Sequence, residues 1–104
     1  MEKILERRYP INGEGNANRL DVNIVYQKGD ELDRRRGYFL SICPVHASGM
    51  FVTYEGWSGA RVFLGRVPRK SKRKEKDLVE KYDDLFERYV KPFCSDKGYT
   101  ITIE

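Results

Sequence analysis

The sequence predicts an α+β fold, an antiparallel meander of three to five strands with one long amphipathic helix packed on one face. Two observations carry this prediction. Residues 77–93, DLVEKYDDLFERYVKPF, have apolar side chains at three- and four-residue steps, the period of a helix docked on a flat surface. Before residue 66, short segments alternate apolar and polar residues, the pattern of half-buried strands that would supply this surface.

The clearest strands are residues 20–28 and 38–45. In the first, the even-numbered residues from 20 to 26 are apolar and share one face. The second contains Pro44, which has no N–H to give to a neighbouring strand, so we expect the strand to end or bulge there. Short connections between consecutive strands favour antiparallel neighbours.

The other upstream segments are less regular. Residues 50–57 alternate and are expected to form a third strand that GWSG interrupts. Residues 60–67 fit either a fourth strand or a short helix capped by Ser58, and we favour the strand because Gly65 and Pro68 weaken a helix.

The first nineteen residues give the weakest pattern. Residues 1–11 fit a short strand or a turn of helix, and Pro10 would end either one. Residues 12–19, NGEGNANR, are predicted to be a loop because they are rich in Asn and Gly.

A basic arm leads into the helix. Residues 66–76, RVPRKSKRKEK, hold seven Lys or Arg and one Glu, a net charge of +6. Ser71 could cap a helix, but the cations that follow it oppose the helix dipole. The main helix is therefore expected at about 76–93, ending near Pro92 or a turn later. A C-terminal strand is expected at 99–104, YTITIE.

Composition indicates a single domain over 1–104, with 39% apolar and 35% charged residues. No stretch approaches the ~20 apolar residues of a membrane span, and the N-terminus does not resemble a signal peptide. A cytoplasmic location without membrane contact is therefore expected. Cys43 and Cys94 are expected to be free thiols, with a disulfide as the alternative.

Nucleic acid is the predicted partner of the arm, because a run of cations makes salt-sensitive phosphate contacts. An acidic protein, or plain solvation of the charges, is the alternative. A second cluster, Arg34, Arg35 and Arg36, would frame a groove if it lies beside the arm. The residues predicted to contact phosphate in the arm are Arg66, Arg69, Lys70, Lys72, Arg73, Lys74 and Lys76.

Tyr54 and Trp57 are the aromatic candidates for stacking on bases, as binders of single strands require. Cross-strand packing is the alternative for both rings. Trp57, which lies between the two glycines of GWSG, is the better of the two.

Catalytic and metal sites are not predicted, and no cofactor is expected. Cys43 and His46 have a spacing found in metal sites, but with Cys94 they offer at most three of the four ligands of a closed zinc site. Nucleophilic catalysis by Cys43 with His46 would need both in one cleft, and nothing else in the sequence supports one.

The runs RGYFLSICPV (36–45) and MFVTYEGWSGARVFLGRVPRKSKRKE (50–75) resemble small uncharacterised proteins of integrative mobile elements in Gram-positive bacteria. The resemblance covers about the middle third of the chain and implies a phage or conjugative element, whose proteins serve DNA transfer, regulation or evasion of host defence. Curved strands followed by a helix are also similar to the single-stranded-DNA-binding coactivator fold of positive cofactor four, although a strand after the helix departs from it.

The leading hypothesis is therefore a non-enzymatic accessory protein that binds nucleic acid, DNA before RNA, single-stranded or through the phosphate backbone. The alternative is a protein-binding inhibitor, an anti-CRISPR-like counter-defence factor that acts on a host nuclease or ribonucleoprotein complex. A structural homodimer without a ligand of its own is the third reading.

Overall fold

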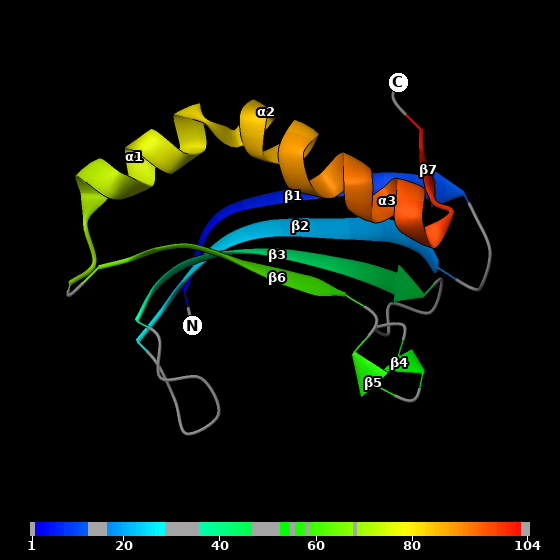
Figure 1. Ribbon diagram of the computed structural model, residues 1–104, viewed down its shortest axis with the longest axis horizontal. Helices are drawn as coiled ribbons and strands as arrows, with labels where there is room; N and C mark the ends of the chain where they lie inside the picture. Colours follow the sequence, from blue (N-terminus) through cyan, green and yellow to red (C-terminus); the bar gives the residue numbers. More distant parts are fainter. Residues whose placement is uncertain are drawn as a thin grey trace.

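The computed structural model of the protein describes residues 2–12, 17–28, 36–46, 53–54, 56–57, 59–67 and 69–102. These residues form a curled antiparallel sheet of five strands with helices across one face, so the predicted α+β class is confirmed (Figure 1). The strand order is β6-β3-β2-β1-β7. The strands of this sheet are β1 (Glu2–Asn12), β2 (Ala17–Gln27), β3 (Gly37–His46), β6 (Ala60–Arg66) and β7 (Thr100–Ile101).

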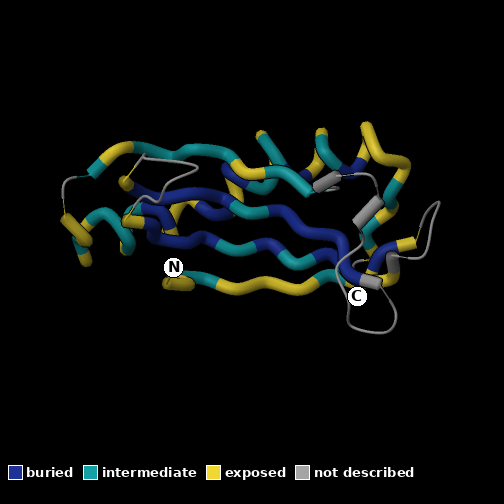
Figure 2. Tube along the Cα trace, turned by 90° about the horizontal axis from the view of Figure 1, so that it is seen from below, coloured by how far each residue is buried: buried dark blue, intermediate teal, exposed yellow. Residues whose placement is uncertain are grey.

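The core lies between the sheet and the helices. The even-numbered residues from 20 to 26 of β2 and from 38 to 42 of β3 face the helices and are almost fully buried, as the alternation at 20–26 predicts. Figure 2 shows the central strands buried along most of their length, whereas β1, next to the sheet edge, is largely exposed. The helical residues that complete this core are Leu78, Tyr82, Leu85, Val90 and Cys94.

The two predicted interruptions by proline are wrong. Strand β3 continues through Pro44 to His46, and β1 continues through Pro10 to Asn12. The pairing of β6 with β3 stops at Ile42, so Pro44 lies beyond the stretch where β3 has a neighbour on that side. In β1, strand β7 pairs with Ile11 and Asn12, and the Thr102 N–H donates to the Pro10 carbonyl at 3.0 Å, a bond that needs no N–H from proline.

The predicted third strand, 50–57, is also wrong as a strand of the sheet. Its described part forms two short strands, β4 (Thr53–Tyr54) and β5 (Gly56–Trp57), that pair with each other. Strand β6 pairs with β3 instead. Of the two structures considered for residues 60–67, a strand or a short helix, the strand is therefore confirmed. The C-terminal strand is shorter than predicted, since β7 holds two residues and 103–104 lie outside the described residues.

The helical part begins earlier than predicted and ends about a turn after Pro92, the later of the two predicted ends. Helix α1 (Lys72–Glu80) is followed by a continuous helix of 16 residues, made of α2 (Tyr82–Leu85), the π-helical turn η1 (Phe86–Val90) and α3 (Lys91–Lys97). Gly98, with φ 75°, ends it. Pro92 is accommodated inside the helix, directly after the wide turn in which Lys91 N–H donates to the Phe86 carbonyl.

Tyrosine hydroxyls join helix to sheet. The hydroxyls of Tyr9 on β1 and Tyr82 on α2 lie 2.6 Å apart, and the Tyr9 ring packs against Phe86 at 5.3 Å. Burial raises the pKa of Tyr82, and the hydrogen bond with Tyr9 raises it further. Burial and then a hydrogen bond to Glu75 likewise raise the pKa of Tyr38 on β3.

These shifts predict alkaline destabilisation. A tyrosine whose pKa in the folded protein exceeds the ordinary value of 10.0 makes its full contribution to stability below pH 10.0. Above it the unfolded chain loses the proton first, so the free energy of unfolding falls by about 1.4 kcal/mol per pH unit for each such group. Urea unfolding between about pH 9 and 11 measures this slope. The slope should be shallower in Tyr82→Phe, and equal slopes in variant and parent would contradict the assignment.

Candidate nucleic-acid interface

The predicted basic arm is divided among three structural elements. Arg66 is the last residue of β6, a short connection follows, and the cations from Lys72 to Lys76 occupy the first turns of α1. Seen in Figure 1, this part of the chain forms one end of the molecule, where β6 rises into α1. The arm is therefore held on the folded body, and half of it is helical.

Helix α1 begins at Lys72 because sheet contacts outweigh the unfavourable charges of its first turn. The Ser71 hydroxyl accepts the Lys74 N–H at 3.2 Å and caps the helix. The Tyr38 hydroxyl accepts the backbone N–H of Ser71 at 3.0 Å and donates to the Glu75 carboxylate at 2.6 Å. A buried side chain of β3 thus fixes the helix start that sequence reasoning placed about a turn later.

Two of the predicted phosphate contacts are engaged by the fold. The Lys70 ammonium lies 3.0 Å from Glu75 and 3.3 Å from Glu2, and the hydrogen bond to Glu75 is the main reason that the pKa of Lys70 is raised. Lys74 is half-buried, with its stem against Gly65. The ion pairs of Lys70 and the partial burial of Lys74 leave both cations less available to phosphate than their neighbours.

The remaining cations form a patch that we call the basic end. Arg66, Arg69, Lys72, Arg73 and Lys76 are all exposed, and none has an ion pair within the described residues. Neighbouring strands bring two more cations to the same end. The basic end comprises Lys28, Arg36, Arg66, Arg69, Lys72, Arg73 and Lys76.

Backbone contacts hold Arg36 beside the basic arm, the position that a groove between the arm and the cluster Arg34–Arg36 would need. The Val67 N–H donates to the Arg36 carbonyl at 3.2 Å, and the next residue, Gly37, pairs with Arg66. The Arg36 guanidinium donates to the carbonyl of Lys28 at 3.3 Å. Lys28 was not identified from the sequence as a contact residue. Lys28 ends the predicted strand 20–28, and the next predicted strand begins just after Arg36, so an antiparallel pairing of the two would have placed Lys28 beside Arg36. Arg34 and Arg35 lie outside the described residues.

The predicted aromatic contacts lie elsewhere. Tyr54 and Trp57 belong to β4 and β5, which Figure 1 shows at the opposite end of the molecule from α1. The long axis of the molecule measures 40 Å. The structure describes only the backbone of these two residues, and that backbone does not bring them to the basic end. Within the described residues every aromatic side chain is buried or half-buried.

The outward face of the helices changes sign along its length. At the start of α1 this face carries the exposed cations Lys72, Arg73 and Lys76. Further along the same side of the helices it carries exposed carboxylates, which we call the acidic stripe. Two lysines near this stripe are engaged, since Lys81 pairs with Asp77 at 3.3 Å and Lys91 with Glu87 at 2.7 Å. The acidic stripe comprises Glu80, Asp83, Asp84 and Glu87.

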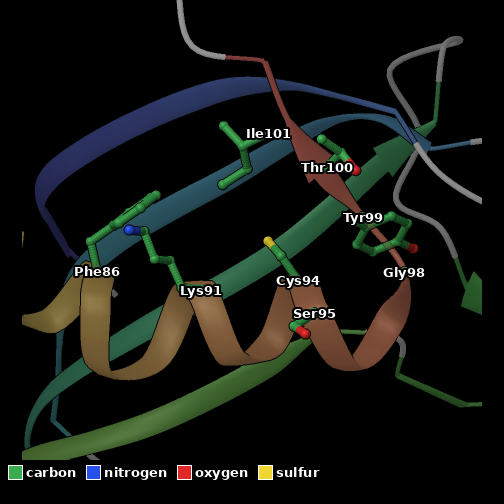
Figure 3. Close-up of a pocket in the computed structure, with 8 residues that line it drawn as sticks. All are labelled: Phe86, Lys91, Cys94, Ser95, Gly98, Tyr99, Thr100 and Ile101. Carbon is green, nitrogen blue, oxygen red and sulfur yellow. The ribbon is translucent and has the colours of Figure 1, made fainter.

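A hollow of about 540 Å³ opens between α3 and β7 (Figure 3), at the end of the molecule opposite the start of α1 (Figure 1). Phe86, Cys94 and Ile101 give it an apolar floor, and Lys91 and Ser95 lie at its side. Because Lys91 is already paired with Glu87, the hollow offers few polar groups to orient a ligand.

The cysteines are both free and buried, as predicted. Cys94 belongs to the core under α3, whereas Cys43 alternates with core-facing residues and so lies on the other face of the sheet. Burial raises the pKa of both thiols, and nearby Asp21 adds to the effect at Cys43. The His46 side chain lies outside the described part of the chain, in which no three potential metal ligands gather.

Comparison of the chain with protein-family models, with curated proteins and with solved structures finds no match in any of the three. None of the described helices is both long and apolar enough to cross a bilayer.

Proposed function

We propose that this protein is a nucleic-acid-binding protein that contacts the phosphate backbone with its basic end. The observation that carries the proposal is the concentration of exposed cations without carboxylate partners at one end of the molecule. Away from the basic end, several cations, among them Arg19, Lys81 and Lys91, lie within 4.0 Å of carboxylates. Arg7, Arg88 and Lys97, on three other elements, have no such partner among the described residues but are not gathered into a patch. Arg66, Arg69, Lys72, Arg73 and Lys76 have no such carboxylate among the described residues, although the chain holds sixteen acidic residues.

Concentrated positive charge favours a polyanion as the partner. Each phosphate neutralised by a Lys or Arg releases condensed counterions, which makes binding strong at low salt and weak at high salt. The cations of the basic end come from strand ends, a connection and the start of α1, and so they are not aligned along one helix that could enter a groove. This arrangement suits contacts with the phosphate backbone, and binding should be largely independent of sequence.

The proposal predicts salt-dependent binding. Fluorescence anisotropy with labelled single- and double-stranded DNA and RNA, from about 50 to about 200 mM salt, should show affinity that falls linearly on logarithmic axes. Two duplexes of unrelated sequence should bind equally well. No binding of any of these probes at the lowest salt would overturn the proposal, and an acidic partner protein would then become the better candidate for the same surface.

A further inference from the structure

The form of the nucleic acid can be inferred from what surrounds the basic end, an inference that depends on the proposed function. We infer that the ligand is a duplex, and that it crosses the start of α1 instead of lying along the helices. Three features of the described residues support this: the absence of a stacking surface beside the cations, the projection of the cations from one end, and the acidic stripe that follows them.

Single-strand binders combine a basic groove with aromatic rings on which bases stack. The basic end has no such ring among the described residues. Tyr38 is fully buried at the helix start, and Phe63, three residues before Arg66, is half-buried with its ring 5.1 Å from Phe39. The sequence candidates for stacking, Tyr54 and Trp57, belong to the opposite end of the molecule. Binding here must therefore come from charge alone.

Charge alone favours a duplex over a single strand. A duplex presents one phosphate per about 1.7 Å of its axis, twice the linear density of one strand. The cations come from separate elements, with Arg36 before β3, Arg66 at the end of β6 and Lys72, Arg73 and Lys76 on α1. Side chains spread over one protruding end can reach both strands of a rigid duplex, whereas a flexible single strand would have to be ordered to meet them.

The acidic stripe determines how the duplex can lie. Glu80, Asp83, Asp84 and Glu87 continue the outward face that begins with Lys72. A duplex parallel to the helices would bring its phosphates against these carboxylates, which is unfavourable for like charges. The duplex must therefore pass across α1, so the contact is short and the logarithmic salt slope should not exceed about 6.

The test compares binding of the 104-residue chain to a duplex of about 20 base pairs, to either of its single strands and to the RNA duplex of the same sequence. We expect the DNA duplex to bind at least about tenfold more tightly than the single strand at equal salt. Equal or tighter binding of the single strand would overturn the inference and leave the proposed function intact. Failure of all probes would overturn the proposed function itself. The RNA duplex identifies which kind of duplex is preferred.

A pair of matched variants tests the orientation. Asp84→Asn removes one exposed carboxylate of the stripe, and Asp96→Asn removes one exposed carboxylate late in α3. Both variants change the net charge equally. We expect the first to raise duplex affinity severalfold and the second to change it much less. Equal effects would show that the stripe does not limit the contact and would overturn the crossing geometry.

Discussion

Replacing Lys72, Arg73 and Lys76 together by Gln should lower nucleic-acid affinity on the order of a hundredfold at about 0.1 M salt. The reason is that each lost phosphate contact removes about 0.9 from the logarithmic salt slope on a duplex, so the slope should fall by roughly 2.7. These residues lie on the outward side of α1, away from the contacts of Ser71 and Glu75 that hold the helix. The fold should therefore survive the change, which circular dichroism can verify before anisotropy measures the affinity.

The matched control is Lys81→Gln/Lys91→Gln/Lys97→Gln, which removes the same charge from the later helices. Lys81 and Lys91 already face carboxylates, at 3.3 Å from Asp77 and 2.7 Å from Glu87. The control should change affinity only through net charge and should leave the salt slope near that of the parent. If both triple variants lower affinity and slope equally, binding is diffuse and the basic end is not a site.

Gly37→Ala should destabilise the fold by about 3 kcal/mol or more. Gly37 begins β3 with φ 158°, a backbone conformation that L residues seldom adopt. A Cβ there would also lie inside the contact distance of the Gly65 carbonyl oxygen on β6. Because both groups belong to backbone of paired strands, the clash can be relieved only by separating β3 from β6 next to Arg66. Urea denaturation measures the loss.

Gly98→Ala is the control for the conformational part of this cost. Gly98 has φ 75°, and nothing lies within 4 Å of a Cβ added there. Its substitution should cost only about 1 kcal/mol, the cost of left-handed backbone for a residue with a side chain. A Gly37→Ala variant as stable as Gly98→Ala would contradict the close approach of β3 and β6. Where Gly37→Ala still folds, reduced duplex binding would link the strand pairing to the basic end.

The elements with a strict period could be predicted from local sequence patterns alone. The alternation at 20–26 places Leu20, Val22 and Ile24 on one face of β2, where all three are fully buried. The 3.6-residue period places Leu78, Tyr82 and Leu85 against the sheet. These patterns are local, because a period of two or of 3.6 residues determines which side chains share a face wherever the element packs. The periodic patterns were sufficient to predict the α+β class, and the run of cations at 66–76 was sufficient to locate the concentrated positive charge.

Three features depend on tertiary contacts: where the elements begin, which strands are neighbours, and which cations are free to contact phosphate. Ser71 caps α1 against the charges that follow because Tyr38, thirty-three residues earlier, holds its backbone. Strand β6 pairs with β3, whereas β4 and β5 pair with each other. The alternation of apolar and polar residues does not indicate which strand lies beside β3. The run of cations looks uniform in sequence, yet Lys70 lies between Glu2 and Glu75 while Arg73 faces solvent. Ion pairing and strand neighbours depend on residues distant in the chain, and so no local pattern records them.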